Sequence, residues 1–169
     1  MEKLHERVIT ALKNLDDTQA TKVAEFAESI AKEKKEREVI YIDGGFDLLH
    51  AGHYNAIRQA KALGDELVVG TNSDADLLQV KGPTIFNGKE RAEIVRHCKF
   101  VSTVHPDTDY TPTPELLDRI GCTAYAHGDD PCYNAAGEDI CEPFRQLGRM
   151  RVFKRTEGVS TTDTTARLL

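Results

Sequence analysis

Two kinds of hydrophobic periodicity divide the chain into a short helical part and a longer alternating part. In residues 1–36, apolar side chains recur every three or four positions, as on one face of a helix: Leu4, Val8, Leu12, Leu15, Val23, Phe26 and Ile30. The segment LDDTQ between the two apolar runs offers Asp16, Asp17 or Thr18 as a helix N-cap. We therefore expect an N-terminal extension of two amphipathic helices, followed by a domain over residues 37–169.

From residue 38 onward, short apolar runs alternate with segments of helical period. The predicted strands cover residues 38–43, 66–71, 100–104, 123–128 and 150–154. The predicted helices cover residues 51–64, 73–80, 89–98, 113–121, 142–148 and 160–169. Strands joined by helices imply right-handed crossovers and a parallel sheet with helices on both faces. The expected fold class is therefore α/β, with a doubly wound parallel five-stranded sheet preceded by a helical segment.

Polar and glycine residues follow four of these strands, at the edge where open parallel sheets bind their ligands. They are Asp43, Gly44, Gly45, Phe46 and Asp47 after the first strand, Thr71 to Asp74 after the second, His127 to Asp130 after the fourth, and Lys154 to Gly158 after the fifth. A purely structural scaffold does not require such a concentration, so we expect a binding site at this edge.

Two histidines, His50 and His53, lie about one turn apart where the first helix of this domain is predicted to begin. Free backbone N–H groups at a helix N-terminus favour anions, and imidazoles can donate hydrogen bonds to phosphate oxygens. Gly45 and Gly52 allow the backbone to approach a ligand closely. The same histidines could instead bind a metal, with His127 as a further ligand, or lie on the surface without a role. The residues alone leave these interpretations open.

Composition excludes several classes of protein. The formal net charge of −6 gives no basic excess for binding nucleic acid, and the content of 40% hydrophobic and 30% charged residues is ordinary for a globular protein. No apolar run is long enough to span a membrane, and the polar N-terminus does not resemble a signal peptide, so we expect a cytoplasmic protein. The cysteines form no C-x-x-C pair, which favours reduced thiols over a zinc site from Cys122, Cys132, Cys141 and His127.

Four motifs connect this pattern to a known family. GGFDLLHAGH, residues 44–53, resembles the H-x-G-H signature of the nucleotidyltransferase superfamily, and KRTEGVSTTD, residues 154–163, resembles the second signature of its cytidylyltransferase branch. KGPTIFNGKER, residues 81–91, is similar to a segment of the eukaryotic lipid-pathway members, and HGDDP, residues 127–131, is most similar to the ethanolamine-phosphate cytidylyltransferases. The resemblance implies a Rossmann-like fold. It also implies that phosphoethanolamine attacks the α-phosphorus of CTP, with Mg²⁺ required, to give CDP-ethanolamine and pyrophosphate.

The resemblance further implies roles for individual residues. His50 and His53 match the imidazoles that hold the triphosphate, Lys81 matches a lysine that bridges CTP and the phosphorylated amino alcohol, and Arg155 matches an arginine on the β- and γ-phosphates. Further contacts to CTP are implied for Gly45, Phe46, His127, Gly128, Asp129, Thr156, Gly158, Val159, Ser160 and Thr161. Contacts to the amino-alcohol phosphate are implied for Lys81, Tyr110, Asp129 and Asp130. No side chain is implied as a metal ligand, so Mg²⁺ is expected to arrive with CTP.

The choice of amino alcohol depends on the chemistry of its cation. A primary ammonium prefers carboxylate acceptors, whereas a trimethylammonium prefers aromatic faces. The chain has no tryptophan, and the similar choline-specific enzymes carry Trp where Tyr110 lies and Tyr where Cys132 lies. Asp129 and Asp130 offer acceptors, which favours phosphoethanolamine. A choline-phosphate cytidylyltransferase and a catalytically silent CTP-binding domain stay open as alternatives.

Two departures from the family pattern concern assembly. Ethanolamine-type members usually contain two cytidylyltransferase repeats, whereas this sequence contains one. A homodimer is expected from the resemblance, but KFVSTV, residues 99–104, replaces the R-Y-V-D-E-V of relatives at the strand where they dimerise. Because of this substitution, the sequence does not decide whether the chain dimerises through this strand, whereas the predicted site is unaffected.

Overall fold

The computed structural model describes residues 9–134 and 136–166, and the chain divides into two units, residues 1–37 and 38–169. In the first unit, residues 9–13 are helical and α2 follows as Asp17–Glu36. Asp16 is the N-cap of α2: its side chain accepts the Gln19 backbone N–H at 2.8 Å, and the Gln19 side chain accepts the Asp16 N–H at 3.2 Å. The apolar side chains of this unit that are exposed include Leu12, Val23, Phe26 and Ile30. Leu4 and Val8 lie outside the described residues.

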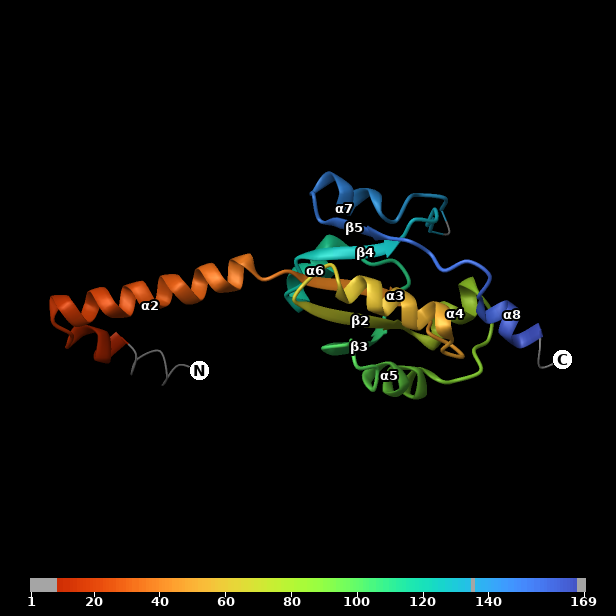
Figure 1. The fold of residues 1–169 in the computed structure, drawn as a ribbon, viewed down its shortest axis with the longest axis horizontal. Coiled ribbons are helices and arrows are strands. Elements are labelled where there is room, and N and C mark those ends of the chain that lie inside the picture. The colour runs from red at the N-terminus through yellow and green to blue at the C-terminus, as the bar shows by residue number, and fades with distance from the viewer. Residues whose placement is uncertain (1–8, 135, 167–169) are drawn as a thin grey trace. The chain divides into compact units, whose positions relative to one another are not determined.

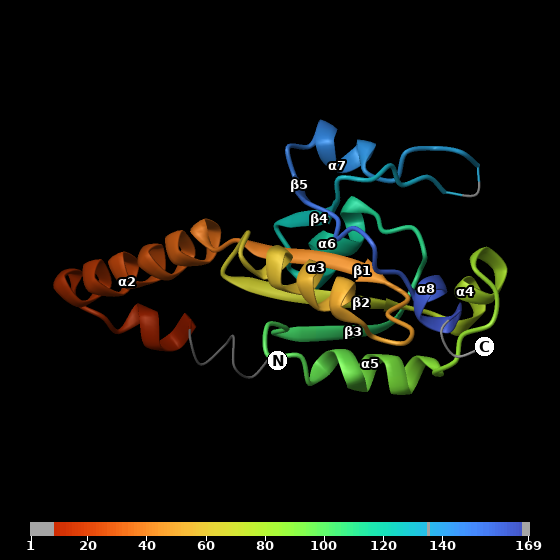
Figure 2. The ribbon, with the colours of Figure 1, turned by 45° about the vertical axis from the view of Figure 1, so that its right-hand side comes forward.

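The second unit is built on a sheet of five strands, each parallel to its neighbours (Figures 1 and 2). The strands are β1 (Val39–Gly44), β2 (Glu66–Asn72), β3 (Thr103–Thr108), β4 (Ala124–Gly128) and β5 (Met150–Phe153), in the spatial order β3-β2-β1-β4-β5. The helices are α3 (Ala51–Lys61), α4 (Asp74–Val80), α5 (Gly88–Arg96), α6 (Pro114–Ile120), α7 (Glu142–Gln146) and α8 (Thr161–Ala166). The predicted α/β architecture with a parallel sheet is confirmed.

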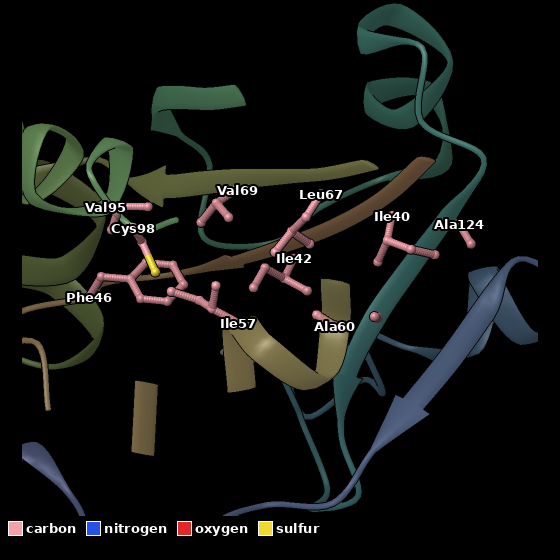
Figure 3. Packing of buried hydrophobic residues seen from close by; sticks show 11 residues of the cluster. Ile40, Ile42, Phe46, Ile57, Ala60, Leu67, Val69, Val95, Cys98 and Ala124 are labelled. Atoms are coloured by element: carbon pink, nitrogen blue, oxygen red, sulfur yellow. The ribbon is translucent and has the colours of Figure 1, made fainter. Parts of the chain in front are cut away.

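Alternate residues of the central strands point to opposite faces of the sheet, and each face carries its own apolar layer. The first layer packs strand side chains against α3 and α5 and includes Ile40, Ile42, Leu67, Val69, Ala124, Ile57, Ala60 and Val95 (Figure 3). The second layer packs strand side chains against α6 and α7 and includes Tyr41, Val68, Tyr125, Leu117 and Phe144. Helices therefore cover both faces, and the site-forming loops are left at the ends of the strands.

The third strand begins later than its apolar run predicts. The pattern indicates a strand over 100–104, whereas β3 spans Thr103–Thr108. The Val101 N–H donates to the Cys98 carbonyl at 2.9 Å in a turn after α5, and the side chains of Phe100 and Val101 pack against the first layer. These apolar residues are therefore explained by core packing from a turn, which periodicity alone cannot separate from a short strand.

Among residues 9–134 and 136–166, no helix combines the length and the apolar character that a bilayer-crossing helix needs.

Arg91 of α5 joins the carboxyl ends of β1 and β2. The side chain is fully buried and donates from Nη1 to the Gly45 carbonyl at 2.6 Å and from Nε to the Phe86 carbonyl at 3.2 Å. Its Nη2 donates to the Asn72 carbonyl at 2.8 Å and to the Asp74 carboxylate at 2.7 Å. A buried guanidinium is costly unless its donors are satisfied, so this set of acceptors fixes the side chain and the loops it joins.

We expect Arg91→Met to lower the free energy of unfolding by about 3 to 5 kcal/mol, because three carbonyl groups and the Asp74 carboxylate each lose one hydrogen-bond donor. Arg96→Met, on the same helix, is the matched control: Arg96 forms an exposed ion pair with Glu93, and its loss should cost under about 1 kcal/mol. Urea unfolding of the two variants measures the difference. Equal, small losses in both would show that Arg91 does not hold these loops.

Candidate active site

The strand order reverses between β1 and β4, because β2 and β3 extend to one side of β1 while β4 and β5 extend to the other. Open parallel sheets bind ligands beyond the carboxyl ends of their strands at such a reversal. A cavity of about 340 Å³ lies at this point, between the end of β1, the start of α3, the end of β4 and residues 153–161. Its volume suits a small-molecule ligand.

The cavity brings together most of the residues singled out by the motifs. Its lining includes Gly45, Phe46, His50, His53, Lys81, His127, Gly128, Asp130, Arg155, Thr156, Val159, Ser160 and Thr161. Asp129 and Gly158 line a neighbouring hollow of about 330 Å³, which shares Arg155 and Thr156 with the first. Tyr110 lines neither of these two cavities, but its ring contacts Lys81. The two signature segments, far apart in the sequence, thus share one cavity.

The two histidines cap the N-terminus of α3 with their ring nitrogens. Nδ1 of His50 accepts the Gly52 N–H at 3.1 Å, and Nδ1 of His53 accepts the His50 N–H at 3.4 Å. The rings stack with their centroids 3.9 Å apart. Because both Nδ1 atoms accept hydrogen bonds, the proton of each neutral imidazole lies on Nε2. Each of these cavity-lining rings therefore carries one Nε2–H donor.

The surroundings of His53 keep its ring neutral. Burial lowers the pKa of His53 from 6.5 to about 4, and the nearby His50 and Lys81 add to that effect. The ring of Phe46 lies 5.5 Å from that of His53 and contributes to this apolar environment. Phe46 itself is buried in the first apolar layer with a positive φ of 51°, so it belongs to the core as well as to the cavity wall.

The segment carrying the second signature is held against α3 by polar contacts. The Asn55 amide donates to the Thr156 hydroxyl at 2.7 Å, and the Gln59 amide donates to the Lys154 carbonyl at 2.8 Å. Asn55 and Gln59 are four residues apart, so they lie on one face of α3. The sequence alone indicates no role for them, because polar residues at that spacing are also typical of a solvent-facing helix surface.

Asp47 organises the loop that follows Lys81. Its carboxylate accepts the backbone N–H groups of Ile85 at 2.7 Å and Phe86 at 3.0 Å, and its carbonyl accepts the Thr161 hydroxyl at 3.4 Å. The sequence places Asp47 at the edge of the sheet but indicates no role for its side chain. The residue joins the Lys81 loop to the start of α8, and both contribute to the cavity.

Two cations of the cavity rest on neighbouring groups. The Lys81 ammonium lies 5.4 Å from the centroid of the Tyr110 ring, a cation–π contact. The Arg155 guanidinium pairs with the Asp130 carboxylate, and the Arg155 backbone N–H donates to Asp129 at 2.9 Å. Arg155 is largely exposed, so its ion pair is weak enough for an incoming anion to compete with it.

Asp43 is a cavity residue to which the motifs assign no role. At the end of β1, its carboxylate accepts the Tyr125 hydroxyl at 2.9 Å and the Asn72 amide at 3.3 Å. Burial raises the pKa of Asp43, and these two hydrogen bonds oppose that rise. A half-buried carboxylate whose hydrogen-bond partners are neutral is an acceptor suited to a ligand cation. Its position directly before two glycines was the available signal.

The metal alternatives receive no support from the described part of the chain. Within it, no three or more His, Cys, Asp or Glu side chains gather in an arrangement that could hold a metal ion. All four thiols are free, with Cys98, Cys122 and Cys141 buried and Cys132 half-buried. Burial raises the pKa of Cys141 to about 11, which disfavours the thiolate that binds zinc.

The chain was compared with protein families and curated proteins. Residues 41–167 match the family model described as cytidylyltransferase-like. The ethanolamine-phosphate cytidylyltransferase of Dictyostelium discoideum is 46% identical over 130 residues, which is 77% of this chain and 36% of that protein. The same comparison with the enzyme of Mus musculus gives 42% identity over 130 residues, 77% of this chain and 32% of that protein. Choline-phosphate cytidylyltransferase A of Rattus norvegicus is 39% identical over 132 residues, 77% of this chain and 36% of that protein.

The chain therefore spans about a third of the length of the curated relatives that it matches. Among solved structures, the lipopolysaccharide core biosynthesis protein from Thermoplasma volcanium superposes with a TM-score of 0.59 at 21% sequence identity. That match covers 72% of this chain and 99% of the other, and it supports the fold.

We expect the His53 imidazole to titrate near pH 4 in the ligand-free protein. The folded pKa is below the unfolded value, so between about pH 4 and 6.5 the unfolded chain binds more protons at this residue. The stability that depends on neutral His53 is thus complete above about pH 6.5 and is lost as the pH falls toward 4. NMR titration of the ring, assigned by the signal missing in His53→Gln, measures the midpoint. A midpoint near 6.5 would contradict the buried, capped geometry.

Proposed function

The chain belongs to the cytidylyltransferase-like family, and on that premise we propose that it transfers the cytidylyl group of CTP to phosphoethanolamine. The products are CDP-ethanolamine and pyrophosphate. The observation that carries this proposal is the single cavity lined by His50, His53 and residues 155–161. It lies at the reversal of strand order and is bordered by hydrogen-bond donors and cations, as a triphosphate requires.

The reaction balances without a nucleophilic side chain. A phosphate oxygen of phosphoethanolamine forms a bond to the α-phosphorus of CTP, and the bond from that phosphorus to the bridging oxygen of pyrophosphate breaks. Transfers of this kind depend on positioning and on stabilising charge at the phosphorus and the leaving group. The neutral rings of His50 and His53 serve that purpose through their Nε2–H groups. Their Nδ1 atoms accept backbone N–H groups, so the ring protons lie on Nε2.

Lys81 and Arg155 supply the positive charge in this proposal. Lys81, at the end of α4, lines the cavity, and the proposal assigns it to the junction of the nucleotide and the amino alcohol. Arg155 borders both the main cavity and the neighbouring hollow, which gives the β- and γ-phosphates a path past its guanidinium. Triphosphate oxygens then replace Asp130 as the partners of Arg155.

Magnesium enters this scheme as part of the nucleotide substrate. Mg²⁺ usually binds through substrate phosphates, water and one or two carboxylates. The donors on the cavity wall are mainly cations and N–H groups, which suit phosphate oxygens, so the chain's residues hold the phosphates that carry the ion. Among the described residues Asp43 and Asp130 are carboxylates on that wall.

The amino-alcohol preference rests on Asp43. A primary ammonium can donate hydrogen bonds to this carboxylate, whereas a trimethylammonium has no N–H to donate. Tyr110 and Tyr133 offer aromatic faces, but the chain contains no tryptophan. We therefore propose phosphoethanolamine over phosphocholine. The expected homodimer stays a prediction.

A paired substrate assay tests the proposed function. The purified chain is incubated with CTP, Mg²⁺ and either phosphoethanolamine or phosphocholine, and pyrophosphate release is followed. We expect turnover with both CTP and phosphoethanolamine present, and a clear preference for that amino alcohol. A preference for phosphocholine would overturn the substrate assignment. Binding of CTP without release of pyrophosphate in the presence of either amino alcohol would instead identify a catalytically silent domain.

We expect His53→Ala to lower kcat/KM by at least about 100-fold, because one donor to the reacting phosphate is lost. His97→Ala is the matched control, since His97 is exposed at the end of α5 and does not line the cavity. Steady-state kinetics, together with circular dichroism to check the fold, measures both. Turnover that survives in the folded His53→Ala variant would remove this imidazole from the mechanism.

A further inference from the structure

The Asp43 carboxylate is held from both sides by residues on the neighbouring strands. Tyr125 of β4 donates to one carboxylate oxygen at 2.9 Å, and Asn72 of β2 donates to the other at 3.3 Å. β1 lies between β2 and β4 in the sheet, so the two donors reach Asp43 from opposite sides. The orientation of the carboxylate is therefore determined by the sheet itself rather than by a flexible loop.

Both donors are themselves fixed by their surroundings. Tyr125 is 2% exposed, and its ring packs 4.7 Å from Phe144 and 6.2 Å from Tyr41, measured between centroids. Asn72 is 1% exposed, and its amide also donates to the Asp109 carbonyl at 3.1 Å. Neither donor can turn away from Asp43 without leaving a buried polar group unsatisfied.

The electrostatic consequence follows from the neutrality of both donors. A hydroxyl and an amide orient a carboxylate and favour its ionised form, but they leave its full negative charge uncompensated. The other ionisable groups around Asp43 are His127 of β4, Lys81, Tyr41 of β1, and Tyr110, Cys132 and Cys141 from the loops. Of these, Lys81 is the standing cation, and it rests over the Tyr110 ring. A half-buried carboxylate at the cavity wall whose hydrogen-bond donors are both neutral attracts a ligand that brings its own cation.

We propose that Tyr125 is a positioning residue which, together with Asn72, presents the Asp43 carboxylate to the ammonium group of the amino-alcohol substrate. This inference rests on the proposed function, because it assigns Asp43 to that substrate. Tyr125 does not touch the ligand itself. It acts on the affinity for the amino alcohol by favouring the ionised form of Asp43 and by holding its carboxylate in one orientation at the cavity wall.

The test is a double-mutant cycle between Tyr125→Phe and Asp43→Asn. Tyr125→Phe should raise the KM for phosphoethanolamine by roughly ten-fold, since one hydrogen bond to a charged group is lost, while the KM for CTP stays unchanged. In the Asp43→Asn background, Tyr125→Phe should have no further effect, because the charge through which it acts is absent. Additive effects of the two substitutions would overturn the proposal, and so would equal changes in both KM values.

Tyr41→Phe is the matched control. Tyr41 is another buried tyrosine of the same apolar layer, and its hydroxyl makes no hydrogen bond to Asp43, whose carboxylate oxygens accept from Tyr125 and Asn72. We expect its loss to leave both KM values unchanged. Thermal unfolding of all variants shows whether a changed KM reflects a damaged fold. A rise in the KM for phosphoethanolamine in Tyr41→Phe equal to that in Tyr125→Phe would mean that packing, not the hydrogen bond, is responsible.

The pH dependence gives a second readout that does not require turnover. Removing the Tyr125 hydroxyl takes away a hydrogen bond that opposes the rise in the pKa of Asp43, so that pKa should increase further in Tyr125→Phe. Carboxyl-carbon NMR of the ligand-free protein measures it, and the acid limb of kcat/KM for phosphoethanolamine should move to higher pH by the same amount. An unmoved carboxyl titration would refute the positioning role. If Tyr125→Phe shifts the titration of Asp43 but the wild-type chain releases no pyrophosphate, only the proposed function is refuted.

Discussion

The N-terminus of α3 imposes the constraint on which the candidate site depends. The first turn of any helix has backbone N–H groups without intrahelical acceptors. Here two of them, those of His50 and Gly52, are accepted by imidazole Nδ1 atoms. That pairing fixes the tautomer of both rings, so the same residues that satisfy the helix carry Nε2–H donors at the cavity. Capping and anion recognition are thus one arrangement, and changing either histidine affects both.

The fold could be predicted because the chain's periodicity changes with each element. Ile40, Tyr41 and Ile42 form a continuous apolar run whose successive side chains enter opposite apolar layers of the sheet. The helices that follow repeat their apolar residues every three or four positions. The prediction placed the start of β3 three residues too early, because Phe100 and Val101 pack from a turn, and it placed the end of α3 three residues too late. Apolar character reports burial, and burial in a turn and burial in an edge strand have the same sequence signal.

The site was predicted unevenly for a similar reason. Residues within the motifs, such as His50 and Arg155, were singled out because the motifs resemble those of a known family and lie at predicted strand ends. Asn55 and Gln59, which hold the Arg155 segment, look like ordinary polar residues of an exposed helix face. Tyr125 looks like a core aromatic residue, and its hydroxyl acquires a meaning only when β4 is paired with β1. Contacts between distant segments are fixed by tertiary packing, which a single sequence does not display.

The charge distribution is compatible with the proposed binding of a polyanion by a chain of net charge −6. Burial keeps the His53 ring neutral, and two cations of the cavity rest on neighbouring groups, Lys81 on the Tyr110 ring and Arg155 on the Asp130 carboxylate. The resting site therefore avoids an uncompensated cluster of positive charges, which would be costly in a partly buried cavity. A triphosphate can draw both cations toward itself at small cost, because exposed ion pairs and cation–π contacts are weak. In the proposed complex, this movement frees the Tyr110 ring and the Asp130 carboxylate from their cations, and the Asp43 carboxylate on the cavity wall is left to accept the ammonium of the amino alcohol.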